Sequence, residues 1–165
     1  MHIQKATMAD LSASMDIYAS ARQFMKETGN ATQWGLTKPS EEQIRKDIAE
    51  EKCHLCMEGE EYLAVFFFSE EKDPTYSYIE DGAWLDDERP YGVIHRIAVA
   101  KRGRGVFGFC EQYCFSRCHN VRIDTHVNNH PMQKALEKAG YTYCGVIYLE
   151  SGESRIAFQK ISEKK

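Results

Sequence analysis

One stretch just past the middle of the chain constrains the fold more than any other. Its first part, Tyr91-Gly92-Val93-Ile94-His95-Arg96-Ile97-Ala98-Val99, is rich in β-branched and other apolar residues and predicts a buried strand. Its second part, Ala100-Lys101-Arg102-Gly103-Arg104-Gly105-Val106-Phe107-Gly108, contains three glycines and three cations. An amphipathic pattern follows to about Cys118 and predicts a helix.

A strand, a glycine-rich basic turn and a helix together suit the binding of an anion. Glycine lets backbone N–H groups point at a bound group, and a helix N-terminus adds partial positive charge. Arg and Lys neutralise the remaining charge, so phosphate or diphosphate is the expected ligand. The turn matches neither a P-loop nor a GxGxxG motif, which leaves a solvated basic hairpin as the alternative.

Composition narrows the class of protein. A chain of 165 residues predicts a single domain, residues 1–165, with 42% hydrophobic and 28% charged residues. The net charge of −4 argues against a nucleic-acid partner, and the positive charge gathers at 101–104. The N-terminus shows no signal-peptide pattern, and the longest apolar run, 63–68, is too short to span a bilayer. We therefore expect a cytoplasmic protein without membrane or nucleic-acid partners.

Six cysteines raise the question of a metal site. The C-x2-C spacing occurs once, at Cys53 and Cys56, whereas structural zinc sites need paired spacings. Cys110, Cys114 and Cys118 recur every four residues and would line one side of a helix. Reduced core thiols and no metal are expected.

The order of the expected elements is β-α-α-β-β-β-α-β-α-β-β. Strands are predicted at 3–6, 53–58, 62–68, 91–99, 121–127, 141–148 and 154–160. One helix is predicted to be opened by 7–10, a second to start at 39–43, a third to follow the glycine-rich turn and end at about 118, and a fourth to span 131–140. Hairpins imply antiparallel neighbours, and the strand-helix-strand unit implies a parallel pair. The fold class is α/β (α+β), a mixed, mostly antiparallel sheet with helices on both faces. Residues 76–90 form an irregular aromatic and acidic insertion.

Three stretches make the chain resemble the GNAT superfamily of N-acetyltransferases. His95-Arg96-Ile97-Ala98-Val99 resembles the central strand of the family. Arg102-Gly103-Arg104-Gly105 resembles its Q/R-x-x-G-x-G/A loop, and the segment from Asn129 to Tyr141 resembles its Asn-led helix that closes as E-K-x-G-F. Arg122-Ile123-Asp124-Thr125-His126 and Gln33-Trp34 are similar to a small bacterial branch of undefined substrate.

The resemblance implies a GNAT-like fold and acetyl-CoA as acyl donor. By analogy, backbone groups of Ile97, Ala98 and Val99 contact the pantetheine arm and the thioester carbonyl. Asn129 contacts the pantetheine or its neighbouring backbone. The diphosphate would be held by the N–H groups of Arg102, Gly103, Arg104, Gly105, Val106, Phe107 and Gly108.

Two departures from the family pattern carry chemical consequences. Phe107 stands where the family has a third small residue, and the loop is about two residues shorter than usual. Leu136 stands where many members carry the tyrosine that protonates the leaving thiolate. That role is therefore not transferred; Tyr141 and Tyr143 lie nearby in the sequence, and Tyr143 is kept as a catalytic candidate.

Further residues are candidates for catalysis and acceptor binding. His95 suits a general base at neutral pH, with a histidine hydrogen-bonded inside the sheet as the alternative. Glu80 is a second catalytic candidate, and Glu80 with Asp81 would attract a cationic acceptor if the insertion faces the pocket. Their alternative is a solvated loop. Trp34 could form a wall of the acceptor pocket or anchor its own loop on the core.

The leading hypothesis is an acetyl-CoA-dependent N-acetyltransferase. A primary amine of a small molecule or peptide would attack the thioester directly in a ternary complex. The alternatives are a CoA-binding sensor on the same fold and an unrelated phosphate-binding α/β protein. A homodimer would be usual for the superfamily.

Overall fold

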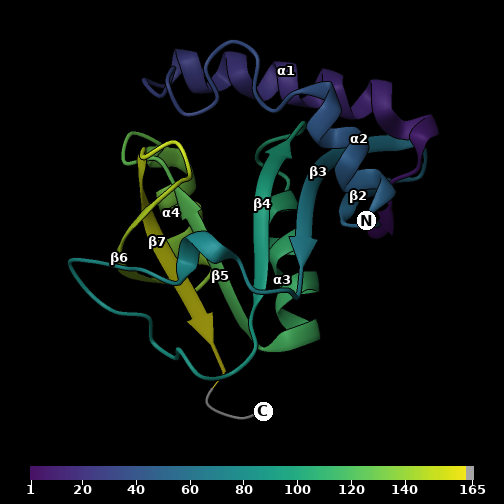
Figure 1. The fold of residues 1–165 in the computed structure, drawn as a ribbon. Helices are drawn as coiled ribbons and strands as arrows, with labels where there is room; N and C mark the ends of the chain where they lie inside the picture. The colour runs from purple at the N-terminus through teal and green to yellow at the C-terminus, as the bar shows by residue number, and fades with distance from the viewer. Residues whose placement is uncertain (163–165) are drawn as a thin grey trace. The chain divides into compact units, whose positions relative to one another are not determined.

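The computed structural model describes residues 1–162, which contain seven strands and four α-helices in the order that the sequence predicts (Figure 1). Their bounds are β1 His2–Lys5, α1 Leu11–Glu27, α2 Glu41–Ala49, β2 Cys53–Glu58, β3 Glu61–Ser69, β4 Gly92–Val99, α3 Val106–Cys118, β5 Asn120–Thr125, α4 His130–Lys138, β6 Thr142–Tyr148 and β7 Ser154–Ile161. The strands pair in the order β1-β2-β3-β4-β5-β7-β6, mostly antiparallel, which confirms the predicted fold class.

The chain divides into two compact units. The first contains residues 1–68 and 95–113, and the second contains residues 69–94 and those from 114 onward. Strand β4 contributes residues 92–94 to the second unit and residues 95–99 to the first. The boundary between the two units falls within a strand, and a single domain over residues 1–165 stays a prediction.

Capping residues set the helix starts of the first unit. The backbone N–H of Thr7 donates to the Asp10 carboxylate at 2.8 Å, and a short 3₁₀ turn, Met8–Asp10, leads into α1. Ser40 Oγ accepts a hydrogen bond from the Gln43 amide at 3.1 Å and caps α2. Both starts lie where the sequence predicts them.

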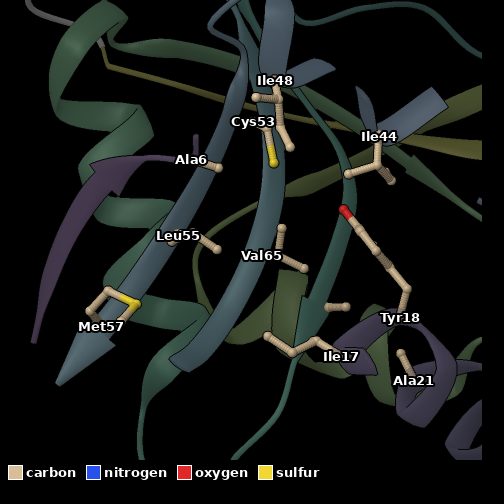
Figure 2. Packing of buried hydrophobic residues seen from close by; sticks show 11 residues of the cluster. Ala6, Ile17, Tyr18, Ala21, Ile44, Ile48, Cys53, Leu55, Met57 and Val65 are labelled. Carbon is tan, nitrogen blue, oxygen red and sulfur yellow. The ribbon is translucent and has the colours of Figure 1, made fainter. Parts of the chain in front are cut away.

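Helices α1 and α2 cover one face of the β1-β2-β3 strands (Figure 2). The buried cluster there consists of Ala6, Ile17, Tyr18, Ala21, Ile44, Ile48, Cys53, Leu55, Met57, Val65 and Ala98. On β2 these are the odd-numbered residues, as the two-residue period of a strand requires. The intervening His54 stacks on Phe66 and lies beside Tyr113 of α3, so α3 covers the other face.

The second unit is built on antiparallel β5, β7 and β6, with the start of β4 parallel to β5. Gly92 pairs with Val121 and Val93 with Arg122, and this pair is the parallel one expected from the strand-helix-strand pattern. The insertion at 76–90 is irregular apart from a bridge between Glu80 and Val146.

The insertion is anchored by buried side chains. Tyr76 and Trp84 lie in the core cluster of the second unit, and the Trp84 indole donates to the Tyr76 carbonyl at 3.0 Å. The Arg122 guanidinium lies 4.0 Å from the ring centres of both Trp84 and Tyr91, and it donates to the Asp86 carbonyl at 2.9 Å. A solvated loop therefore describes only part of this segment.

The remaining features of the fold are the six cysteines and the lengths of the helices. None of the six cysteines, all within residues 1–162, forms a disulfide, and Cys118 is half-buried while the other five are buried. No group of residues within 1–162 is arranged to hold a metal ion. Among the helices described, none combines the length and apolar character needed to cross a membrane.

Candidate functional site

The loop after β4 presents backbone amides and glycines to solvent. Gly103 has φ +82° and Gly105 has φ +72°, conformations that side chains other than glycine rarely adopt. Apart from the glycine itself and its two chain neighbours, no residue has an atom within 4 Å of the place where a Cβ would stand at Gly103 or Gly105, which leaves space beside the backbone. The Phe109 amide bonds the Gly105 carbonyl at 3.1 Å, so the amides of 106–108 precede the first helical hydrogen bond.

The three cations of this loop have partners within the first unit. The Arg102 guanidinium stacks on the Phe24 ring of α1, 3.6 Å from its centre. Arg104 and Lys101 share the Glu61 carboxylate of β3, at 3.5 and 3.7 Å. The stacking holds Arg102 in place without neutralising its charge, so the loop keeps a net positive charge.

Strand β4 carries an irregularity at Arg96, just before the loop. Its φ of +49° lies in the left-handed region, which costs a non-glycine residue about 1–2 kcal/mol. The Tyr18 hydroxyl donates to the Arg96 carbonyl at 2.6 Å, and the Arg96 guanidinium donates to both carboxylate oxygens of buried Asp47, at 2.9 and 3.0 Å. Burial raises the pKa of Tyr18, which keeps its hydroxyl a donor. Helices α1 and α2 thus hold this conformation.

His95 lies next to this irregularity. Its half-buried ring lies 5.5 Å from the Phe67 ring, and the Arg96 guanidinium lies 4.7 Å from the same ring. His95 and Arg96 are consecutive, yet both contact Phe67. In a regular strand, consecutive side chains point to opposite faces of the sheet. The positive φ of Arg96 therefore interrupts the alternation of side chains along β4 just before the loop.

Trp34 packs on the core of the first unit. Its ring meets the Tyr18 ring edge-on at 5.6 Å, and it lies against the buried cluster under α1 and α2. This contact anchors the loop between the helices, as one of the two interpretations of Trp34 expects.

Glu80 and Asp81 belong to the second unit. The hydroxyls of Tyr148 and Tyr78 both donate to the Glu80 carboxylate, that of Tyr78 at 2.7 Å. These hydrogen bonds, first that of Tyr148 and then that of Tyr78, lower the pKa of Glu80, so the carboxylate is held in its ionised form. Asp81 is exposed, with φ +58°.

Asn129 and Tyr143 also lie in the second unit. The Asn129 side chain accepts a hydrogen bond from the Met132 amide at 3.1 Å and caps α4. Tyr143 is exposed on β6, with its ring edge-on to Phe158 at 5.9 Å. Leu136, in the position of the family tyrosine, is fully buried.

The predicted site residues therefore divide between the units. The first unit contains Trp34, His95, the end of β4, the loop at 100–105 and the start of α3, and the second contains Glu80, Asp81, Asn129 and Tyr143. Sequence reasoning missed Tyr18, Phe24, Asp47 and Glu61. Each contacts β4 or its loop from a distant element, and no local pattern reports such a pairing.

The loop residues fit a diphosphate. Cations, glycines in positive φ and the first amides of α3 occur together in one exposed turn, and nothing in the first unit fills the space over the two glycines. The structure thus defines an α/β protein with a turn before a helix N-terminus that is suited to bind an anionic group.

Solved structures identify the family. The chain is similar to a GNAT-family acetyltransferase of Streptococcus agalactiae, with 31% identity over 99% of this chain and 96% of that one and a TM-score of 0.90. This likeness shows that the chain belongs to the GNAT family of acetyltransferases.

More distant structures share the fold. One is yncA from Salmonella typhimurium, solved with acetyl-CoA, at 13% identity over 98% of this chain and 94% of that one, with a TM-score of 0.64. Another is a ribosomal-protein-alanine N-acetyltransferase from Brucella melitensis, at 16% identity over 98% and 100% and a TM-score of 0.63. No family model matches the chain, and no curated protein matches its sequence.

Proposed function

We propose that the protein transfers the acetyl group of acetyl-CoA to a primary amine of a small molecule or a protein. The observation that carries this proposal is the exposed loop at 100–105 leading into α3, in a chain that belongs to an acetyltransferase family. The acetyl-CoA in the yncA structure supports the donor, and the N-acetyltransferase from Brucella supports an amine as acceptor.

The roles of the first-unit residues follow from their chemistry. Acetyl-CoA supplies the acetyl group as a thioester. In the proposal, the amides of 102–108 hold its diphosphate, and Arg102 and Arg104 neutralise the charge. Backbone groups of Ile97, Ala98 and Val99 align the pantetheine arm and polarise the thioester carbonyl toward the attacking amine. Asn129 is proposed to contact the pantetheine.

Proton transfer needs a base for the amine and an acid for the leaving thiolate. We assign the base to His95, because imidazole exchanges protons readily near neutral pH. Glu80 is less suited to that role, because its two tyrosine hydrogen bonds lower its pKa and weaken it as a base. Glu80 and Asp81 are instead proposed to attract a cationic acceptor, and Tyr143 is proposed as the acid. Trp34 stays a separate candidate for acceptor binding.

Binding of coenzyme A tests the loop assignment. The variant carrying Arg102→Ala and Arg104→Ala should bind coenzyme A at least about tenfold more weakly in titration calorimetry, because each guanidinium can donate charge-assisted hydrogen bonds. Arg45→Ala is the matched control, since Arg45 is a half-exposed arginine paired with Glu41 on α2. Equal affinity of the double variant and the wild type would refute the placement of the diphosphate.

A CoA-binding sensor is the second candidate, favoured by the buried Leu136 in place of a tyrosine. Release of free thiol from acetyl-CoA in the presence of polyamines, amino acids or aminoglycosides separates the two functions. Amine-dependent release supports the enzyme. Tight binding of acetyl-CoA without release from any of these amines supports the sensor.

A further inference from the structure

The pairing of β3 with its neighbours places Glu61 beside the cations of the loop. It is the first residue of β3 and pairs with Glu58 across the hairpin. Two residues later, the Leu63 carbonyl accepts a hydrogen bond from the Ala100 amide at 2.8 Å, which fixes the start of β3 beside the start of the loop. The Glu61 carboxylate therefore reaches Arg104 at 3.5 Å and Lys101 at 3.7 Å.

We propose that Glu61 is a resident competing anion that lowers the affinity of the loop for the diphosphate of acyl-CoA. This inference rests on the proposed function, because it requires the diphosphate to bind at the loop. In the free protein, Glu61 offsets about one of the three positive charges of the loop. The incoming diphosphate has to displace its contacts or bind beside its negative charge.

The contacts are of the kind that a ligand can replace. Both distances exceed those of a direct charge-assisted hydrogen bond, and all three side chains are about half-exposed. Exposed pairs of this kind contribute little to stability, so Glu61 is not needed to hold the loop in place. Arg102 differs because it stacks on Phe24, and its charge stays available to a ligand.

Removal of the negative charge at Glu61 should therefore tighten binding. Glu61→Gln keeps the size of the side chain and should lower the Kd for coenzyme A by about three- to tenfold at low salt. The gain should shrink at high salt, because exposed charges are screened. Glu60→Gln is the matched control: Glu60 is the adjacent exposed carboxylate, and within residues 1–162 no ion pair joins it to Lys101 or Arg104.

Titration calorimetry with coenzyme A and with pantetheine, which lacks the diphosphate, decides the matter. The proposal expects tighter coenzyme A binding by Glu61→Gln, affinity within about twofold of the wild type for Glu60→Gln, and unchanged pantetheine binding by both. Unchanged or weaker coenzyme A binding by Glu61→Gln would overturn it, the latter by making Glu61 an organiser of the loop. An equal gain in both variants, or a gain for pantetheine, would overturn it as well.

The two experiments distinguish a failure of the proposed diphosphate site from a failure of the inference about Glu61. If Arg102→Ala with Arg104→Ala binds coenzyme A as the wild type does, the loop assignment fails, and the inference about Glu61 fails with it. If that double variant binds weakly while Glu61→Gln is unchanged, the loop holds the diphosphate and only the competing role of Glu61 is lost.

Discussion

Asp86 illustrates how one half-buried carboxylate can organise a loop that lacks regular structure. Its carboxylate accepts hydrogen bonds from the amides of Glu88 at 2.9 Å and Arg89 at 3.0 Å, and from Arg89 Nε at 2.5 Å. Its carbonyl accepts from Arg122 at 2.9 Å and from Gln159 at 3.0 Å. The insertion is thereby tied to β5 and β7 of its own unit.

The hydrogen bonds to the Asp86 carboxylate should make the stability of the protein depend on pH. The hydrogen bonds, those from the two amides first, lower the pKa of Asp86 from 3.8 to about 2. Because the folded-state pKa is depressed, the ionised carboxylate stabilises the fold above pH 3.8, and this contribution is lost as the pH falls toward 2.

Asp86→Asn should accordingly lower the free energy of unfolding at neutral pH, and its difference from the wild type should shrink between pH 4 and pH 2. Urea unfolding at several pH values measures it. Asp87→Asn, an exposed neighbour, serves as the comparison, although it removes one partner of Arg122. A difference for Asp86→Asn that is independent of pH would contradict the assignment.

At the scale of elements, β4 depends on two helices that precede it in the chain. The Arg96 carbonyl is turned toward the Tyr18 hydroxyl, and Asp47 holds the Arg96 side chain. Neither helix contributes a residue to the loop, yet both hold the segment from which the loop starts. The start of the loop therefore depends on how α1 and α2 pack.

Tyr18→Phe tests this dependence. The variant leaves the Arg96 carbonyl without its hydroxyl donor, which should cost about 1–3 kcal/mol of unfolding free energy. It should also weaken coenzyme A binding, because the backbone before the loop is less firmly held. Urea unfolding measures the loss of stability, and calorimetry measures the loss of affinity. Tyr62→Phe is the control, since the Tyr62 hydroxyl donates to the Asp10 carboxylate and not to a residue of β4. Full stability of Tyr18→Phe would contradict the role of Tyr18.

A second change at this scale probes the approach of the insertion to β6. A Cβ at Gly82 would stand 2.0 Å from the Cys144 carbonyl oxygen, so Gly82→Ala must displace backbone. We expect a lower melting temperature from this variant, whereas Ala83→Ser, one residue away and exposed, should be neutral. An unchanged melting temperature for Gly82→Ala would contradict the close approach.

The elements and the loop could be predicted because their signals are local. Strand and helix periods, the Ser40 cap, and glycines interleaved with cations are all read within a few residues. The turn at Arg96 could not be predicted, because an arginine in a β-branched run gives no sign of a positive φ. The same limit hid the burial of Arg122, since an alternating pattern does not reveal the two rings that enclose it.

Of the candidate site, only the glycine-rich loop could be predicted from the sequence. Glycine spacing locates the loop, but the partners of its cations, Phe24 and Glu61, come from elements far away in the sequence. The acidic character of Glu80 was visible, whereas the two tyrosines that hold it ionised were not.

At the scale of the whole molecule, the six cysteines are distributed over both units and form no disulfide bonds within residues 1–162. Burial raises the pKa of Cys53 to about 12 and also raises that of Cys118, so these thiols stay protonated. Because the other five thiols are buried, Ellman's reagent should reach at most Cys118 in the native protein, and all six thiols after denaturation. Several fast thiols in the native protein would contradict the burial described. Cys118→Ser should remove the single fast thiol if Cys118 carries it.

The chain has two tryptophans, and each compact unit contains one of them: Trp34 beside Tyr18, and Trp84 under Arg122. Replacing either with phenylalanine leaves a single tryptophan, and its emission on selective excitation reports on one half of the polypeptide alone. Spectroscopy on two such proteins can thus reveal whether denaturant melts both halves at one midpoint or at two, without any attached dye.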